Sequence, residues 1–199
     1  MAELIYYERN LSHRLPPGEA IFLTFRLAGS SPKVALEKLK AEQELANRQA
    51  AETDIHTYAL QKRYFARFDA ILDEARFGPQ WLREPTVAAV VQAAIHHYHT
   101  RAYELVCYCL MPNHVHLLVA LPSDAPPLIR TLQHLKGYTA QQANRILQRT
   151  GQFWQRETYD HVVRNAGEMQ RIVAYVLQYP VKAGLVTEWQ QWPYSYWAP

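Results

Sequence analysis

The middle of the chain holds two short apolar runs separated by a turn, YELVCYCLMPNHVHLLVAL at residues 103–121. Runs of this length, rich in β-branched and aromatic residues and bounded by Pro and Asn, are typical of strands. We therefore expect strands over 103–110 and 114–121, joined by a Met-Pro-Asn turn. Residues two apart in a strand project from the same face, so His114 and His116 should stand side by side.

Further elements are expected on both sides of this pair of strands. An apolar run predicts a strand at 21–28, and the stretch 153–163 also looks extended. Apolar residues at helical spacing predict three helices, at 85–99, at 128–147 and from Asn165 to about Gln178. Pro180 should prevent much continuation of the last helix. We expect that helix to bury a stripe of apolar residues, namely Met169, Ile172, Val173 and Val176.

The resulting order is strand, helix, two strands, helix, strand, helix. This βαββαβ order predicts an α+β fold of the ferredoxin-like type, an antiparallel sheet backed by helices. Helical spacing between Lys33 and Phe77 predicts a helical insertion after the first strand. We interpret residues 1–199 as a single domain that carries this insertion at about 33–77.

The composition is that of an ordinary globular protein, with 49% hydrophobic and 20% charged residues. No apolar run approaches the roughly 20 residues needed to span a bilayer, and the start lacks the layout of a secretory signal. The two cysteines, Cys107 and Cys109, make no disulfide framework. We expect a cytoplasmic protein without membrane contact, either a monomer or a homodimer.

Positive charge is concentrated in the second half of the chain. Between Pro126 and Val186 there are eight basic residues and three acidic ones. This excess favours an anionic partner such as nucleic acid, although each cation taken singly is more often a solvated surface charge. The candidate DNA-phosphate contacts are Arg130, Lys136, Arg145, Arg149, Arg156 and Arg164.

Two neighbouring imidazoles such as His114 and His116 can share one divalent cation through their neutral ring nitrogens. Such a site needs at least one more ligand. For a bare His-x-His pair, half-buried strand histidines without a metal are the simpler interpretation.

The sequence around this pair changes that balance, because CLMPNHVHLLV at 109–119 resembles the His-hydrophobe-His motif of the HUH endonuclease superfamily. More narrowly, it resembles the single-tyrosine transposases that include the REP-associated tyrosine transposases. Three further stretches resemble blocks of that family in the same order, PPGEAIFLTFRL at 16–27, FWQRETYDHVVRN at 153–165 and YVLQYPVKAGLV at 175–186. The resemblance covers residues 1–30 and about 100–197.

This resemblance implies a metal-dependent endonuclease and strand transferase that cuts single-stranded DNA near hairpins or palindromic repeats. Tyr175 would be the nucleophile and would form a covalent 5′-phosphotyrosine. His114 and His116 would bind Mg²⁺ or Mn²⁺. From the residues alone, Tyr175 falls on the flank of its helix, where its hydroxyl can reach over a sheet edge.

The chain departs from the family pattern at the third metal ligand. A Gln or Asn one helical turn after the nucleophile completes the metal site in related enzymes, but here that position is Tyr179. Gln178 or His161 could substitute, water could fill the position, or activity could be impaired. His161 is equally open to a structural or a phosphate-contacting role.

Two other functions stay open from the sequence. One is a catalytically inert protein on the same fold that binds hairpin DNA or RNA, which Tyr179 favours. The other is a metal-dependent hydrolase of small substrates, which would not depend on Tyr175 and would leave the basic half unexplained. The aromatic residues of 189–197 could pack on the sheet or stack on unpaired bases.

Overall fold

The computed structural model describes residues 6–9, 11–14, 16–30, 41, 67 and 78–198. The chain divides into two compact units, one formed by Met1–Ala28 with Gln80–Pro199 and the other by Gly29–Pro79. The helical insertion expected at about 33–77 lies outside the described residues, apart from positions 41 and 67. The interpretation as a single domain with an insertion therefore stays a prediction. All elements named below belong to the first unit.

The described part of the first unit contains both strands and helices. The strands are β1 (Tyr6–Arg9), β2 (Leu11–Arg14), β3 (Ala20–Leu27), β4 (Glu104–Leu110), β5 (His114–Ala120), β6 (Trp154–Val162) and β7 (Ser195–Trp197). The helices are α3 (Pro85–Tyr98), α4 (Leu128–Ile146) and α5 (Ala166–Lys182), with 3₁₀ turns at Trp81–Arg83 and Trp189–Gln191. No helix in the described ranges is long and apolar enough to cross a membrane.

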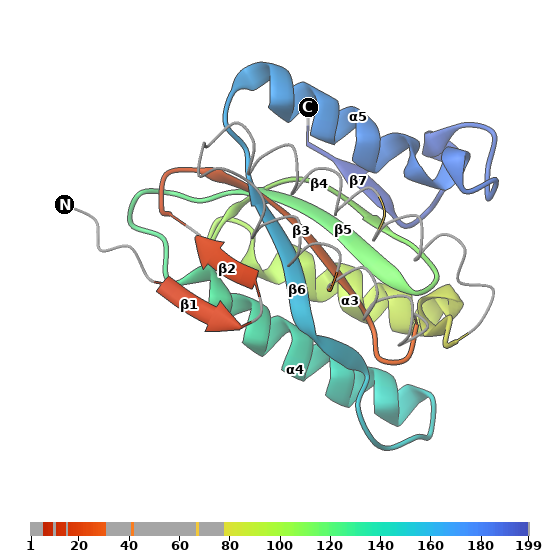
Figure 1. The fold of residues 1–199 in the computed structure, drawn as a ribbon. Coiled ribbons are helices and arrows are strands. Elements are labelled where there is room, and N and C mark those ends of the chain that lie inside the picture. The colour runs from red at the N-terminus through yellow and green to blue at the C-terminus, as the bar shows by residue number, and fades with distance from the viewer. Residues whose placement is uncertain are drawn as a thin grey trace. The chain divides into compact units, whose positions relative to one another are not determined.

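Five strands form one antiparallel sheet in the order β6-β3-β5-β4-β7 (Figure 1). With α3 between β3 and β4, and α4 between β5 and β6, the first four of these strands have the predicted ferredoxin-like order. The prediction of an α+β fold with an antiparallel sheet is thus confirmed. The sheet gains a fifth strand, β7, beside β4, and β1 pairs with β2 in a separate hairpin.

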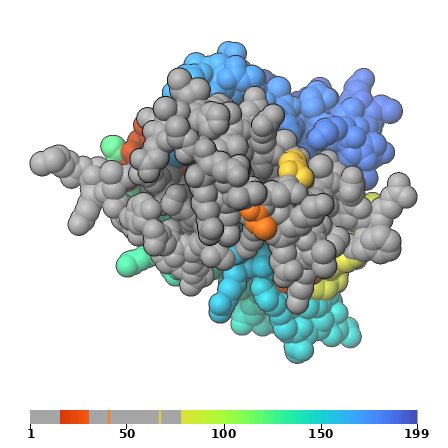
Figure 2. Space-filling model, viewed as in Figure 1, coloured from red at the N-terminus to blue at the C-terminus, as the bar shows by residue number. Residues whose placement is uncertain are grey.

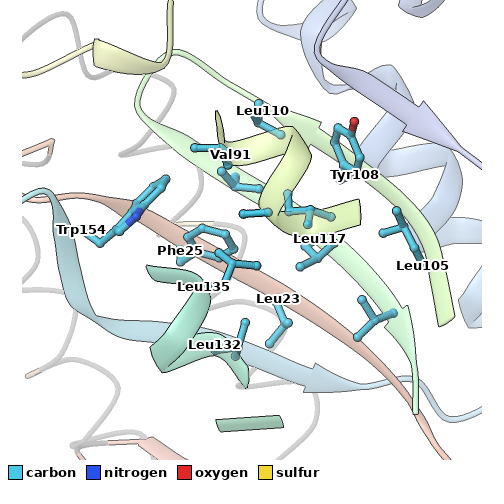
Figure 3. Packing of buried hydrophobic residues seen from close by; sticks show 14 of the residues in the cluster. Leu23, Phe25, Val91, Leu105, Tyr108, Leu110, Leu117, Leu132, Leu135 and Trp154 are labelled. Carbon is cyan, nitrogen blue, oxygen red and sulfur yellow. The ribbon is translucent and has the colours of Figure 1, made fainter. Parts of the chain in front are cut away.

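Helices α3 and α4 pack on one face of this sheet, where alternating strand residues supply apolar side chains. Figure 3 shows Leu23 and Phe25 of β3 and Leu117 of β5 converging with Val91 of α3 and Leu132 of α4. All five side chains are at most 3% exposed. Since burying such a side chain contributes roughly 1.5–3 kcal/mol, this cluster is the main stabilising contact of the fold.

Helix α5 lies on the opposite face, where it contacts β4 and β5 (Figure 1). The strand residues that alternate with the core project towards this face, among them Thr24, His114 and His116. Asn165 caps the helix as expected, because its Oδ1 accepts from the backbone N–H of Glu168 at 2.9 Å. The histidine pair is therefore separated from the main core by the sheet.

The prediction that this helix ends near Gln178 is wrong, because α5 continues through Pro180 to Lys182. Proline removes one backbone N–H, and in the last turn of a helix its fixed φ can still be accommodated. The predicted buried stripe is also partly wrong. Among its members only Val176 is buried, and the buried apolar side chains of α5 instead lie in its C-terminal half, at Val176, Leu177, Tyr179 and Pro180.

The C-terminal aromatic segment packs on the sheet, which was one of the two alternatives. The Tyr196 ring on β7 stacks on Tyr108 of β4 with 5.5 Å between centroids. The indole N–H of Trp192 donates to the Leu110 carbonyl at 2.9 Å. On the strand paired with β7, Cys107 and Cys109 are buried free thiols.

Candidate functional site

The two histidines of β5 are brought together as their spacing predicts. Both project towards α5, and their side chains are almost inaccessible, with His114 1% and His116 0% exposed. Their Nε2 atoms lie 3.1 Å apart. The two ring nitrogens therefore converge on one point.

A chain of hydrogen bonds fixes the orientation of both rings. His114 Nδ1 lies 2.6 Å from Asn113 Oδ1, and His116 Nδ1 lies 2.8 Å from Thr24 Oγ1. Because a carbonyl oxygen only accepts, His114 must carry its proton on Nδ1. His116 Nε2 then donates to His114 Nε2, and the Thr24 hydroxyl donates to His116 Nδ1.

Burial keeps both imidazoles neutral. It lowers the pKa of His114 from 6.5 to about 3. Burial, then the neighbouring charges of His114 and Lys182, lower the pKa of His116 well below 6.5. Both rings are therefore uncharged at neutral pH, which is the state in which imidazole binds a metal.

The geometry of the pair fits two ligands of one divalent cation. Metal–nitrogen bonds of about 2.1 Å at right angles hold two nitrogens about 3.0 Å apart, close to the observed separation. If Nε2 of each ring binds metal, each Nδ1–H can donate to an oxygen, to Asn113 Oδ1 and to Thr24 Oγ1, the outer arrangement usual for histidine ligands. No cluster of three His, Cys, Asp or Glu side chains surrounds such a position among the described residues.

Two tyrosine rings of α5 lie against the histidines. The half-buried Tyr175 has its ring centroid 5.5 Å from that of His116 and 6.1 Å from that of Phe22. Tyr179, one turn later and 1% exposed, lies 4.4 Å from His116 and 5.4 Å from His114. The structure thus places the predicted nucleophile beside the predicted metal ligands, and it places Tyr179 against both imidazoles.

Neither candidate for the third ligand is held against the pair. Gln178 is exposed, because it precedes Tyr179 by one residue and so points about 100° away around the helix. His161 lies on β6, two strands from β5, which is about 10 Å across the sheet. Its Nε2 is 3.1 Å from Oε1 of the buried Glu168. Their roles as ligands therefore stay predictions that this conformation does not support.

Four of the six candidate phosphate contacts are exposed, namely Arg130, Arg145, Arg156 and Arg164. Arg130 and Arg145 belong to α4, which lies across the sheet from α5. In the space-filling view, α5 and the C-terminal segment in blue are separated from α4 in teal (Figure 2). These two arginines are therefore remote from Tyr175, and Arg164, at the start of α5, is on the tyrosine's side of the sheet.

Lys136 of α4 is engaged within the protein. Its ammonium donates to the carbonyls of Gln155 and Arg156 at 2.7 and 3.1 Å and to Thr158 Oγ1 at 3.1 Å. These acceptors lie where the pairing of β3 with β6 is irregular. The lysine therefore provides hydrogen-bond donors to backbone carbonyls at this irregularity. Burial, and to a smaller extent Arg26, lowers the pKa of Lys136 to about 8.

Arg149 is also held by its own chain. Its guanidinium lies 3.8 Å from the centroid of the Trp81 ring and donates to Asn144 Oδ1. Trp81 in turn stacks on Phe153, with 5.4 Å between ring centroids. Lys136 and Arg149 therefore contribute to packing, and their predicted role in binding DNA has no support from their positions.

Several site residues were not anticipated from the sequence. Thr24 could not be identified, because its contact with His116 depends on the register between β3 and β5. Asn113 was visible as the neighbour of His114, and polar residues next to a ligand often orient it. Lys182 could have been identified from the sequence, since it follows Tyr175 by seven residues and so shares its helical face. Its ammonium lies 5.3 Å from the Tyr179 ring centroid.

Comparison with known proteins finds transposases that are similar to this chain. The family model described as "Transposase IS200 like" matches residues 80–178, which include the histidine pair and Tyr175. A Haemophilus influenzae protein described as a REP-associated tyrosine transposase is 30% identical over 102 residues, covering 47% of this chain and 58% of the relative. The REP-associated tyrosine transposase of Escherichia coli is 24% identical over 95 residues, covering 48% and 54%.

The chain thus matches just over half the length of these curated relatives. The fold is also that of a solved structure of a REP-associated tyrosine transposase bound to a REP hairpin. That likeness has a TM-score of 0.56 and 19% identity and covers 98% of this chain and 82% of the other. Residues 80–178 thus resemble an IS200-like transposase domain, and the two relatives and the shared fold agree with this resemblance.

Proposed function

We propose that the chain cuts and rejoins single-stranded DNA through a covalent link between a 5′-phosphate and Tyr175. The observation that carries this proposal is the position of the Tyr175 ring, 5.5 Å from the ring of His116 on the α5 side of the sheet. The Tyr175 ring is half buried and its hydroxyl is buried in this conformation, so a strand of DNA must displace the groups that cover the hydroxyl before it can react.

The proposed metal ligands are Nε2 of His114 and Nε2 of His116. A divalent cation bound there would polarise the scissile phosphate and offset the negative charge that develops on it. Of the two predicted ions, Mn²⁺ suits a pair of imidazoles better, because Mg²⁺ takes mainly oxygen ligands. Asn113 and Thr24 would keep both rings in the orientation that directs Nε2 towards the site.

Tyr175 carries out the cleavage and the rejoining of the strand. Tyr175 Oη attacks phosphorus in line, its phenolic proton is lost, and the bond from phosphorus to the 3′ oxygen breaks to give a 3′-hydroxyl. When a 3′-hydroxyl attacks the phosphotyrosine, a phosphodiester forms again and the phenol is released. The reaction conserves the number of ester bonds, so joining needs no nucleotide cofactor.

The substrate class proposed is single-stranded DNA next to a hairpin. This follows from the relatives that are described as REP-associated transposases and from the solved relative bound to a REP hairpin. The exposed Arg156 and Arg164 are the predicted phosphate contacts on or beside the elements that frame the site, β6 and α5.

The experiment is a denaturing gel after incubation with Mn²⁺ or Mg²⁺ and hairpin oligonucleotides from the DNA flanking the gene, labelled at either end. We expect a metal-dependent adduct that retains the label 3′ of the cut. It should be absent in Tyr175→Phe and His114→Ala and present in the matched control Tyr138→Phe, which alters an exposed tyrosine of α4. Hairpin binding without any adduct would contradict the proposal.

A further inference from the structure

Two basic residues of α5 share the helical face of the proposed nucleophile, Arg171 one turn before it and Lys182 two turns after it, and Lys182 lies at the end of the helix that holds Tyr179. At 100° per residue, Tyr175, Tyr179 and Lys182 fall within about 60° of arc on α5. The ammonium of Lys182 lies 5.3 Å from the centroid of the Tyr179 ring, and that ring lies 4.4 Å from His116. A row of contacts therefore leads from Lys182 to the buried histidine.

Lys182 also differs from the other cation next to the pair in being accessible. Arg26 of β3 is the register partner of His114, but its side chain is only 7% exposed. Lys182 is exposed in the last turn of α5. A lysine carries its charge on a flexible four-carbon stem, so the ammonium can follow a phosphate that moves towards Tyr175.

We propose that Lys182 binds the scissile phosphate and holds it beside Tyr175. This inference rests on the proposed strand-cutting function and adds a substrate contact to it. The ammonium donates hydrogen bonds to the non-bridging oxygens and stays protonated throughout. Negative charge grows on phosphoryl and leaving oxygens as the Tyr175–phosphorus bond forms and the bond to the 3′ oxygen breaks, so the contact strengthens during the attack.

The test measures binding, so it does not depend on turnover. Affinities are measured in the Tyr175→Phe background, which keeps the DNA intact, for a series of hairpin oligonucleotides that each carry one uncharged methylphosphonate linkage. With Lys182 present, we expect neutralising the scissile linkage to weaken binding about tenfold. With Lys182→Met, the same change at that linkage should have no more effect than at its neighbours. Lys182→Arg, which keeps the charge, should restore most of the loss.

Arg145→Met serves as the matched control, because it removes an equal charge from the exposed surface of α4. It should lower the affinity for every oligonucleotide by the same factor, so that the dependence of affinity on the position of the uncharged linkage stays unchanged. The inference is overturned if affinity depends on the position of the methylphosphonate in the same way with Lys182→Met as without it. It is also overturned if the linkage whose effect depends on Lys182 is not the one that the wild type cuts. Failure of the proposed function shows separately, as the absence of any wild-type adduct on the denaturing gel.

Discussion

The ring of Tyr179 lies 4.4 Å from the ring of His116, closer than the proposed nucleophile Tyr175 at 5.5 Å. It occupies the position one helical turn after Tyr175 where the resemblance to single-tyrosine transposases implies an amide ligand. An aromatic ring in this place contacts both imidazoles but gives them no carbonyl oxygen to share a metal with. At the proposed metal site, Tyr179 therefore leaves the two imidazoles without the amide ligand that the resemblance implies.

Tyr179→Asn should increase the affinity for Mn²⁺, because an amide oxygen is a better ligand than a neutral phenol. We expect a gain of about tenfold, or about 1.4 kcal/mol, measured by calorimetric titration of the metal. Tyr179→Phe keeps the ring and should leave the affinity close to that of the wild type. Equal affinities for the Asn variant and the wild type would show that Tyr179 does not occupy a ligand position.

Thr24→Val should weaken the same metal site without touching a ligand. The Thr24 hydroxyl is 2.8 Å from His116 Nδ1, and its loss removes the partner that orients that ring. Loss of such outer contacts typically costs about 10–100-fold in metal affinity. Calorimetric titration beside the exposed control Thr187→Val checks this, and an unchanged affinity would mean that the ring needs no support from β3.

Lys136 should make stability depend on pH in the alkaline range. Its folded-state pKa of about 8 lies below the ordinary 10.5, so the unfolded chain binds more protons between these values and stability rises with pH. Between pH 8 and pH 10, the free energy of unfolding of the wild type should rise by about 2 kcal/mol relative to that of Lys136→Met. Urea unfolding of both proteins at each pH measures this difference. Ionisation of the buried Tyr103 and Cys107 affects both proteins equally and therefore cancels. A constant difference would contradict the buried position of the ammonium.

Arg149 and Arg156 should respond differently to removal of their charge. Arg149→Ala loses the contact with Trp81 and should lower the free energy of unfolding by about 1–2 kcal/mol while leaving the salt dependence of DNA binding unchanged. Arg156→Ala removes an exposed cation and should weaken DNA binding and reduce its salt dependence. Thermal unfolding and binding at several salt concentrations separate the two effects. The opposite assignment would place the DNA along Arg149.

Local patterns in the sequence were sufficient for four strands of the sheet and for the histidine pair, but not for β7. The period of two in β5 determines that His114 and His116 share a face, and this holds whatever packs against them. The strand at β6 and the cap at Asn165 follow from equally local features.

Features that depend on packing were not predictable in this way. Pro180 was expected to end α5, but the effect of a proline depends on how many turns follow it, and α5 continues to Lys182 with Leu177 and Pro180 buried. Lys136 and Arg149 were assigned to DNA by their charge, but their partners come from β6, Trp81 and Asn144. Contacts between elements distant in sequence decide whether a cation faces solvent or the protein.

The most direct test of the account is to identify the residue that carries DNA. After incubation with Mn²⁺ and a hairpin oligonucleotide, the wild-type protein is digested with a protease and a nuclease, and the modified peptide is sequenced by mass spectrometry. We predict a 5′-linked nucleotide on Tyr175, which lies beside His116. A nucleotide on Tyr179 or on any other residue would contradict the central claim, as would the recovery of no modified peptide from protein that has cut its DNA.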